Sequence, residues 1–336
     1  MTLSSTLPSC LALFTALIPL WAPAAEAKPE ASVSGVVFAD YSAPTSGQLA
    51  GFNLTRAFLT GKVRIDNVWS GVITLNPYAE PLPSGSTEPH DVLLQNAYLQ
   101  ADGLYPGGSL QLGMVTLPWT EYEYGFWGYR MLGTVPLAGG IGKGQTYVGT
   151  WDKGLKALGS NGPLDYALAV YNGEGFRSGE TDGFKSAQGR VSLVAPFGME
   201  LTALGERSRT AAKFVSDRAS VLLGFRSDTF RCALQGTRLW DQASETSPFG
   251  MGHVLSAYEV AALPIPGVPG VELLLRGDYI EPSEITAGDE RLEAIAGLSF
   301  KPAKGVTLVL DNQNITRYGA TTTNANVVAL HTSLAF

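Results

Sequence analysis

The chain has 336 residues, a formal net charge of −7, 45% hydrophobic residues and only 16% charged residues. Soluble globular domains usually carry about a quarter charged residues, so this composition is depleted in charge. No segment beyond the N-terminal region approaches the run of about eighteen apolar residues that a transmembrane helix requires, and no continuous basic stretch indicates nucleic-acid binding. Apolar residues spread thinly along the chain are typical of a membrane β-barrel.

Residues 1–27 are expected to form a secretory signal peptide. An apolar run at Cys10–Leu20 precedes small-residue cleavage sites at Ala22–Ala24 and Ala25–Ala27, although no Lys or Arg precedes that run. Lipidation of Cys10 is disfavoured because this residue lies at the start of the apolar run instead of after it. Cleavage leaves Cys232 as a single cysteine, so we expect an exported domain of residues 28–336 without an internal disulfide.

Segments with alternating apolar and polar residues follow one another along the rest of the chain. Most are near the ~9–11 residues that a tilted strand needs to cross a bilayer. The sixteen segments are 31–41, 52–65, 68–77, 92–101, 108–117, 145–156, 163–172, 186–195, 199–206, 218–227, 229–239, 252–262, 270–280, 290–300, 304–314 and 326–336. They predict an all-β fold, a transmembrane antiparallel β-barrel of about 16 strands.

The connections between these segments alternate in length. Short ones follow even-numbered strands: 66–67, 103–107, 159–162, 196–198, 227–228 and 302–303, with Asn161–Gly162 typical of a type I′ hairpin turn. Longer ones follow odd-numbered strands: 42–51, 78–91, 118–144, 173–185, 207–217, 240–251, 281–289 and 315–325. This alternation predicts short periplasmic turns and long extracellular loops. The apolar, Pro-rich turn 263–269 fits the pattern less well.

The two faces of most predicted strands differ in polarity. In segment 270–280, one face carries Val271, Leu273 and Leu275, and the other carries Glu272, Arg276 and Asp278. A charge that faces hydrocarbon costs about 2–4 kcal/mol, so the charged face is expected to line an aqueous lumen. About sixteen strands are also too many for side chains to fill the barrel, which leaves a channel. The first strand alternates poorly, so its register stays open.

The last strand, 326–336, has an apolar face of Val328, Leu330, Leu334 and Phe336. In a soluble sheet such an edge would invite aggregation. We therefore expect it to close the barrel against the first strand, with Phe336 on the lipid face as the signal for the barrel-assembly machinery. The outward partner is then outer-membrane lipid.

The longest connection, Pro118–Gly144, carries six aromatic residues between Trp119 and Tyr129. A loop of this length is usually functional or disordered, and this composition disfavours disorder. Our hypothesis is that it folds into the lumen as a pore constriction, with Glu121, Glu123 and Arg130 available to the pore. An outward lid or a contact between neighbouring barrels is the alternative.

Basic residues on lumen faces form a second group of candidates: Arg56, Lys62, Arg64, Arg190, Arg226, Arg231, Arg276 and Arg291. Acidic residues that could also reach the lumen are Glu200, Glu206, Glu259, Glu272, Asp278, Glu293 and Asp311. Rings of Arg or Lys favour anions and rings of Asp or Glu favour cations, so the mixture leaves the selectivity open. Ion-pair ladders that only stiffen the wall are the alternative. The pore-lining candidates are Arg56, Lys62, Glu121, Glu123, Arg130, Arg231, Arg276, Asp278 and Arg291.

No enzyme signature is present in the sequence. The three histidines, His90, His253 and His331, are scattered, and no G-x-S-x-G sequence occurs. We therefore expect neither catalysis nor a cofactor or metal site.

Four segments carry a resemblance to a known family: FNLTRAFLTGKV (52–63), LLQNAYLQADG (93–103), SLQLGMVTLPW (109–119) and YALAVYNGEG (166–175). With them the chain resembles the phosphate-selective porin O and P family of bacterial outer-membrane channels, mainly over residues 52–200. The resemblance implies a sixteen-stranded, homotrimeric porin that passes small solutes, with Arg56 the foremost ligand candidate. The family name suggests anions or phosphate.

The sequence thus predicts a water-filled porin in the bacterial outer membrane, for passive diffusion of ions and small hydrophilic solutes. The alternative is a plugged or partner-binding outer-membrane barrel with a structural role. A third possibility, a secreted soluble all-β binding protein, requires polar outward faces that Leu273 and Leu275 do not provide unless two sheets pack together.

Overall fold

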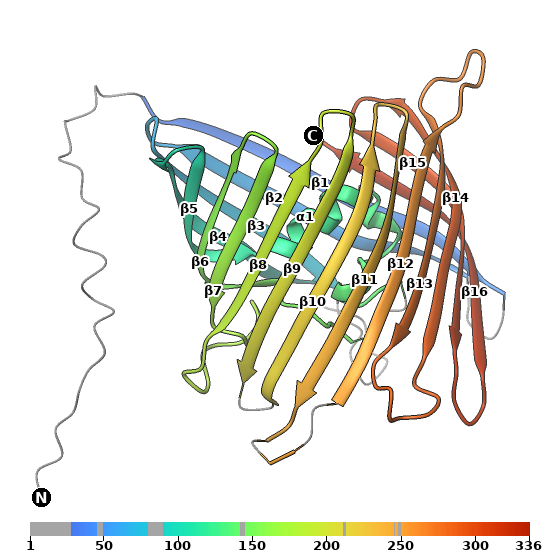
Figure 1. Cartoon of the computed structure of the whole chain (residues 1–336). Helices are drawn as coiled ribbons and strands as arrows, with labels where there is room; N and C mark the ends of the chain where they lie inside the picture. The colour runs from blue at the N-terminus through green and yellow to red at the C-terminus, as the bar shows by residue number, and fades with distance from the viewer. Residues whose placement is uncertain are drawn as a thin grey trace, which may run out of the picture.

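The computed structural model describes residues 28–45, 50–79, 90–141, 145–210, 213–244, 246–247 and 250–336; the predicted signal peptide, 1–27, lies outside these. Within the described part of the chain, sixteen strands form one closed antiparallel barrel (Figure 1). Each strand pairs with the next in sequence, and β1 pairs with β16. No helix among these residues is long and apolar enough to cross a membrane.

All sixteen predicted segments correspond to strands. The strands are β1 (Glu30–Pro44), β2 (Gly51–Arg64), β3 (Trp69–Ala79), β4 (His90–Tyr105), β5 (Gly108–Thr116), β6 (Trp151–Asn161), β7 (Leu164–Tyr171), β8 (Ser186–Val194), β9 (Met199–Thr210), β10 (Lys213–Arg226), β11 (Phe230–Gln242), β12 (Gly250–Ala262), β13 (Val271–Glu281), β14 (Arg291–Ala303), β15 (Val306–Arg317) and β16 (Thr323–Ala335). Between β5 and β6 lie the helix α1 (Pro118–Trp127) and two 3₁₀ turns, η1 (Arg130–Leu132) and η2 (Pro136–Ala138).

Short turns share the upper rim of the barrel in Figure 1, and the longer loops β7–β8, β11–β12 and β13–β14 share the lower rim. One predicted long connection, 207–217, is wrong. β9 continues to Thr210 and β10 begins at Lys213, and their register includes Arg207 opposite Asp217. Polar side chains on both faces end the hydrophobic alternation there, although the backbone ladder continues.

The predicted strand 145–156 begins later than expected, at Trp151. The amides of Tyr147 and Val148 donate to the carbonyl of Leu137, and the amide of Leu117 donates to the carbonyl of Thr150. Tyr147, Val148 and Thr150 therefore bond with η2 and with the residue before α1 instead of extending β6.

The predicted division into inward and outward faces is confirmed. On β3, Ser70 and Thr74 are buried inside the barrel, whereas Ile73 is 55% exposed on the outer surface. On β13, Arg276 and Asp278 point inward and Leu275 points outward. The expectation that Glu259 could reach the lumen is wrong. Glu259 follows the inward-facing Tyr258 on β12, so its side chain faces outward.

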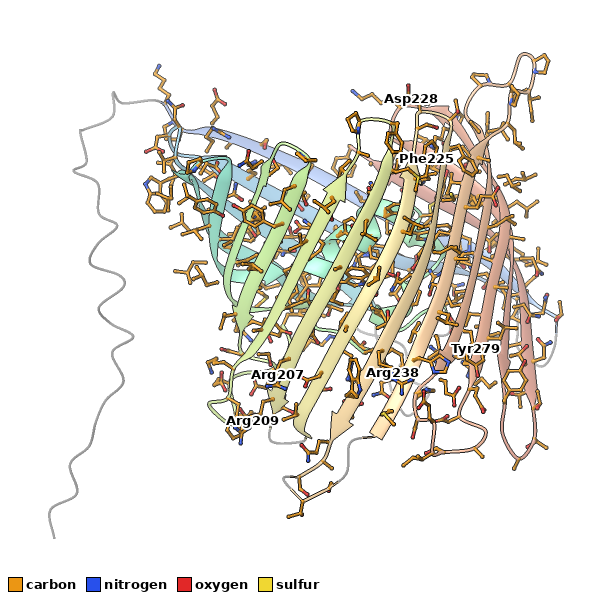
Figure 2. All side chains as sticks on the ribbon, in the orientation of Figure 1. Arg207, Arg209, Phe225, Asp228, Arg238 and Tyr279 are labelled. Carbon is orange, nitrogen blue, oxygen red and sulfur yellow. The ribbon has the colours of Figure 1, made fainter. Side chains whose placement is uncertain are left out.

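The outer surface places several of its charged side chains near the rims. Figure 2 shows Arg207, Arg238 and Tyr279 toward the rim of the long loops, and Phe225 and Asp228 toward the opposite rim. Large apolar side chains such as Leu310, which is 57% exposed, cover the strands between the rims. This distribution is typical of an apolar belt between two interfaces.

The barrel closes as expected, with the C-terminal residue paired to β1. The amide of Gly35 donates to the carbonyl of Phe336 at 2.9 Å, and the amide of Phe336 donates back at 3.0 Å. The phenyl ring covers Gly35, where an added Cβ would lie 2.3 Å from a ring carbon. The register of β1 is now defined: Phe38 and Asp40 point inward, and a bulge in β2 after Leu54 accommodates the change in pairing.

Candidate functional site

Residues 117–141 and 145–150, here called the inserted segment, lie inside the barrel, where Figure 1 shows α1 surrounded by strands. Pro118 suits the first turn of α1, because its missing N–H would have no helical partner there. Gly128 ends the helix in the left-handed region at φ 77° and donates its amide to the carbonyl of Tyr124. The role of this connection as a pore constriction stays a prediction.

An apolar cluster joins the inserted segment to the barrel wall. Trp119, Phe126 and Trp127 are almost completely buried. They belong to one cluster with inward-facing apolar residues of β10–β15: Leu222, Leu239, Val254, Leu274, Ile280, Ile295 and Val309. The sequence interpretation treated the inward positions of these strands as polar and missed this surface. Consecutive apolar residues such as Leu274 and Leu275 on β13 could have indicated this surface, because they make both faces of the strand apolar.

Polar side chains of the wall also hold the backbone of the inserted segment. The contacts are Gln313 Nε2 to Leu132 O (3.0 Å), Arg276 Nη1 to Thr134 O (2.8 Å), Arg231 Nη2 to Trp127 O (3.1 Å), Arg218 Nε to Tyr147 O (2.7 Å) and Ile141 N to Glu293 Oε2 (2.6 Å). Hydrogen bonds that involve a charged group are about twice as strong as neutral ones. The inserted segment is thus fixed to the wall by polar as well as apolar contacts.

Several predicted pore-lining residues lie behind the inserted segment. Arg276 and Asp278 form an ion pair at 2.6 Å with both side chains fully buried. Arg291 pairs with the buried Glu293 at 2.7 Å and approaches the carbonyl of Gly139. Together with Arg231, which binds the segment's backbone, these groups are occupied by the segment and by one another. This differs from their expected exposure to the pore.

Glu123 is also covered, because it lies on the face of α1 that packs against the wall. Its side chain is fully buried and accepts a hydrogen bond from the Tyr258 hydroxyl at 2.6 Å. Burial raises the pKa of Glu123 from 4.5 to about 7, while the Tyr258 hydrogen bond and the charge of Arg276 act in the opposite direction. The carboxyl therefore titrates near neutral pH. Its neighbour Glu121 instead has a 52% exposed side chain, paired with Lys156 at 2.8 Å.

Three predicted residues, Arg56, Lys62 and Arg130, lie on the opposite side of the lumen. Arg56 and Lys62 point inward from β2 and retain exposed surface. Arg130 stacks on the rings of Tyr124 and Trp151 at 4.5 and 4.9 Å, and it also contacts Phe58. Burial lowers the pKa of Arg130 to about 10, with a smaller contribution from the charge of Arg56.

Arg56 and Arg130 line a common cavity of about 330 Å³ between the inserted segment and strands β1, β2, β15 and β16. Asp40 and His331 line the same cavity. The sequence interpretation did not select these two residues, because His331 had no histidine neighbour. Their positions in the alternating pattern could have identified them. Asp40 and His331 occupy inward positions on β1 and β16, the two strands that close the barrel, and are paired with each other across those strands.

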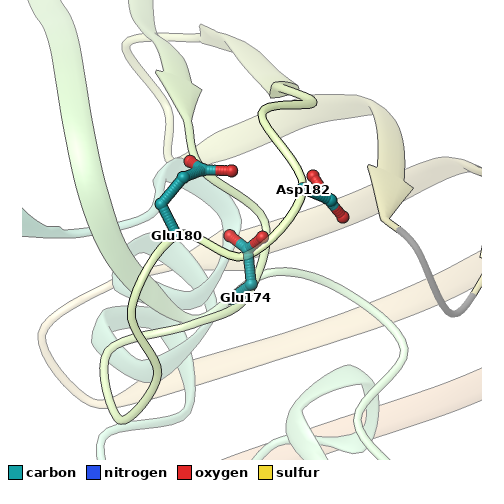
Figure 3. Close-up of side chains that lie close together, drawn as sticks. All are labelled: Glu174, Glu180 and Asp182. Atoms are coloured by element: carbon teal, nitrogen blue, oxygen red, sulfur yellow. The ribbon is translucent and has the colours of Figure 1, made fainter.

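A second acidic group lies in the β7–β8 loop. Glu174, Glu180 and Asp182 bring carboxylate oxygens within 4.8 Å of one another in the β7–β8 loop (Figure 3). Lys185 and the amide of Gly183 donate to Glu180. These contacts account for the group as part of the loop's own structure.

Comparisons with known proteins give the fold. No protein-family model and no curated protein matches the sequence. One similar solved structure is the loop L8 deletion mutant of OmpT from Vibrio cholerae, with a TM-score of 0.66 and 12% identity over 92% of this chain and 99% of that chain. A second is the outer membrane channel DcaP of Acinetobacter baumannii, with a TM-score of 0.64 and 12% identity over 93% of this chain and 99% of that chain. A third is the anion-selective porin from Comamonas acidovorans, with a TM-score of 0.63 and 12% identity over 92% of this chain and 100% of that chain. At this identity the likeness concerns architecture: this chain has the fold of outer-membrane β-barrel proteins.

Proposed function

We propose that this protein is a porin of the bacterial outer membrane that passes ions and small hydrophilic solutes by passive diffusion. The observation that carries the proposal is the closed barrel, whose outer surface is covered by exposed apolar residues while charged side chains such as Arg276 and Asp278 point inward. The inserted segment packs mainly on β10–β15 and reaches Phe58 of β2, whereas Lys62 and Arg64 of β2 remain exposed and Arg56 half-buried. In this proposal residues 118–144 are the constriction and the path runs past Arg56, Lys62 and Arg130.

The basic residues on this path favour small anions, phosphate among them. Arg56, Lys62, Arg64 and Arg130 form no ion pair with any residue in the described ranges, whereas Arg276 and Arg291 are neutralised by carboxylates. Unpaired Arg and Lys side chains in a pore attract anions. The resemblance to the O and P porin family agrees with this preference.

Assembly and insertion complete the proposal. One similar structure, OmpT of Vibrio cholerae, is described as a trimer form, and a homotrimer is the assembly we propose for this chain. Phe336 ends an exposed apolar row on β16 that would face lipid and present the terminal residue to the barrel-assembly machinery.

A plugged barrel is the second candidate, and one observation favours it. The inserted segment and the inward-facing apolar residues of β10–β15 form one buried apolar cluster inside the barrel. If the remaining space is too narrow for ions, the barrel would have a structural or partner-binding role.

Single-channel recording in planar bilayers separates the two. A porin gives discrete conductance steps, and a KCl gradient gives a reversal potential whose sign reports anion preference. Folded protein, verified by heat-modifiable migration in gels, that gives no conductance would reject the porin and support the plugged barrel. A reversal potential of the cation-selective sign would reject only the proposed role of the arginines.

A further inference from the structure

We infer that the cavity lined by Arg56, Arg130, Asp40 and His331 is a binding subsite for small zwitterions, solutes that carry a carboxylate and an ammonium group close together. The inference rests on the proposed channel function, which gives such solutes access to the cavity. It goes further by naming the chemical class that the cavity selects.

The cationic side of the cavity has unused hydrogen-bonding capacity. Arg130 is held by stacking on Phe58, Tyr124 and Trp151, and its Nε and Nη2 atoms are buried without a hydrogen-bond partner among the described residues. Stacking uses the faces of a guanidinium, and its N–H groups lie at the edge, so a carboxylate held in the cavity would give these two atoms the partner they lack. Arg56 lines the same cavity, and its positive charge contributes to the lowered pKa of Arg130. Two neighbouring cations without an anion favour binding of one.

The same cavity also has acidic residues in and behind its lining. Asp40 is only 8% exposed and accepts a hydrogen bond from Asn53 Nδ2 at 2.7 Å. His331 lies between two carboxylates, with Nε2 3.1 Å from Asp311 Oδ2 and Nδ1 3.8 Å from Asp40 Oδ2. Gln313, beside His331, is held by the carbonyl of Leu132 in the inserted segment. This network fixes Asp40 at the wall of the cavity, where an ammonium group can approach it.

The cationic and acidic side chains line the same cavity but do not pair with one another. Among the described residues, Asp40 forms an ion pair with neither Arg56 nor Arg130. A simple anion would bind the arginines but leave Asp40 without a partner from the solute, and a simple cation would bind Asp40 but leave the arginines without one. The cavity volume of about 330 Å³ far exceeds the ~30 Å³ share of one water molecule, so a solute of several heavy atoms fits. A compact zwitterion satisfies both kinds of side chain at once.

The test uses the full-length folded protein and three probes at pH 7: glycine, acetate and methylammonium. Saturation-transfer NMR in detergent micelles measures binding, and block of the KCl current in planar bilayers measures occupancy of the path. We expect glycine to bind and block at a concentration at least tenfold lower than acetate or methylammonium. Asp40→Asn and Arg56→Met should each weaken glycine binding about tenfold. The control Lys304→Met, in the exposed β14–β15 turn, should leave it unchanged.

The outcomes distinguish the two proposals. Acetate binding as tight as glycine binding, or glycine binding unaffected by Asp40→Asn, would overturn the zwitterion subsite and leave the channel intact. Glycine binding without any conductance would support the subsite and reject the channel. Heat-modifiable migration of each variant ensures that a loss of binding does not come from unfolded protein.

Discussion

Replacing Glu123 by Gln should remove a pH dependence from the docking of the inserted segment. When the segment is docked, the carboxyl has a pKa of about 7, and when the segment is released into water the ordinary value of 4.5 applies. Below pH 4.5 both states are protonated, so the docked state has its full stability. As the pH rises from about 4.5 to about 7, the released state loses its proton first, and docking becomes less favourable.

The magnitude follows from the difference between the two pKa values, which is about 2.5. At about 1.4 kcal/mol for each pH unit, docking loses about 3 kcal/mol across this window. The ratio of released to docked segment should therefore rise by about two orders of magnitude between pH 5 and pH 8. Glutamine does not titrate, and its amide oxygen can still accept the hydrogen bond from Tyr258.

Current recordings in planar bilayers at pH 5 and pH 8 measure this effect. We expect the wild type to spend more time in a larger, noisier conductance state at pH 8, and Glu123→Gln to show the same behaviour at both values. Glu121→Gln is the matched control, since this carboxylate lies on the same helix but has a 52% exposed side chain. A pH dependence that survives in Glu123→Gln, or release that increases at low pH, would refute the reasoning.

Three further substitutions test the wall, the closure and the outer face. Arg276→Met leaves Asp278 buried without its partner, so the urea midpoint should fall by the equivalent of about 3–5 kcal/mol, and adding Asp278→Asn should recover most of the loss. Gly35→Val forces a side chain against the terminal phenyl ring and should lower the temperature of heat-modifiable unfolding by the equivalent of about 1–3 kcal/mol, whereas Gly61→Ala, with no heavy atom within 4 Å, should not. Leu310→Arg, near the middle of β15, should cost about 2–4 kcal/mol in urea unfolding from lipid vesicles, and an unchanged midpoint would contradict lipid contact.

The barrel itself could be predicted from the sequence, because each strand separates two different environments. Alternation along 270–280 assigned Leu275 to the outer face and Arg276 to the inner face before any pairing was known. The pattern failed at 207–217, where the rim carries polar residues such as Arg207 and Asp217 and the apolar repeat ends before the hydrogen-bonded ladder does. Sequence periodicity reports burial, whereas strand length is decided by backbone pairing.

The candidate site was decided by the tertiary structure. Asp40 and His331 lie near opposite ends of the chain, and only the closure of β1 on β16 places them at one cavity. Glu121 and Glu123 are two residues apart, so a helix with 3.6 residues per turn points them in nearly opposite directions. Which one is buried depends on how α1 packs against β10–β15. The sequence therefore determined the strands, their faces and the unusual aromatic connection, and the packing of that connection determined which charges it covers and which remain in the lumen.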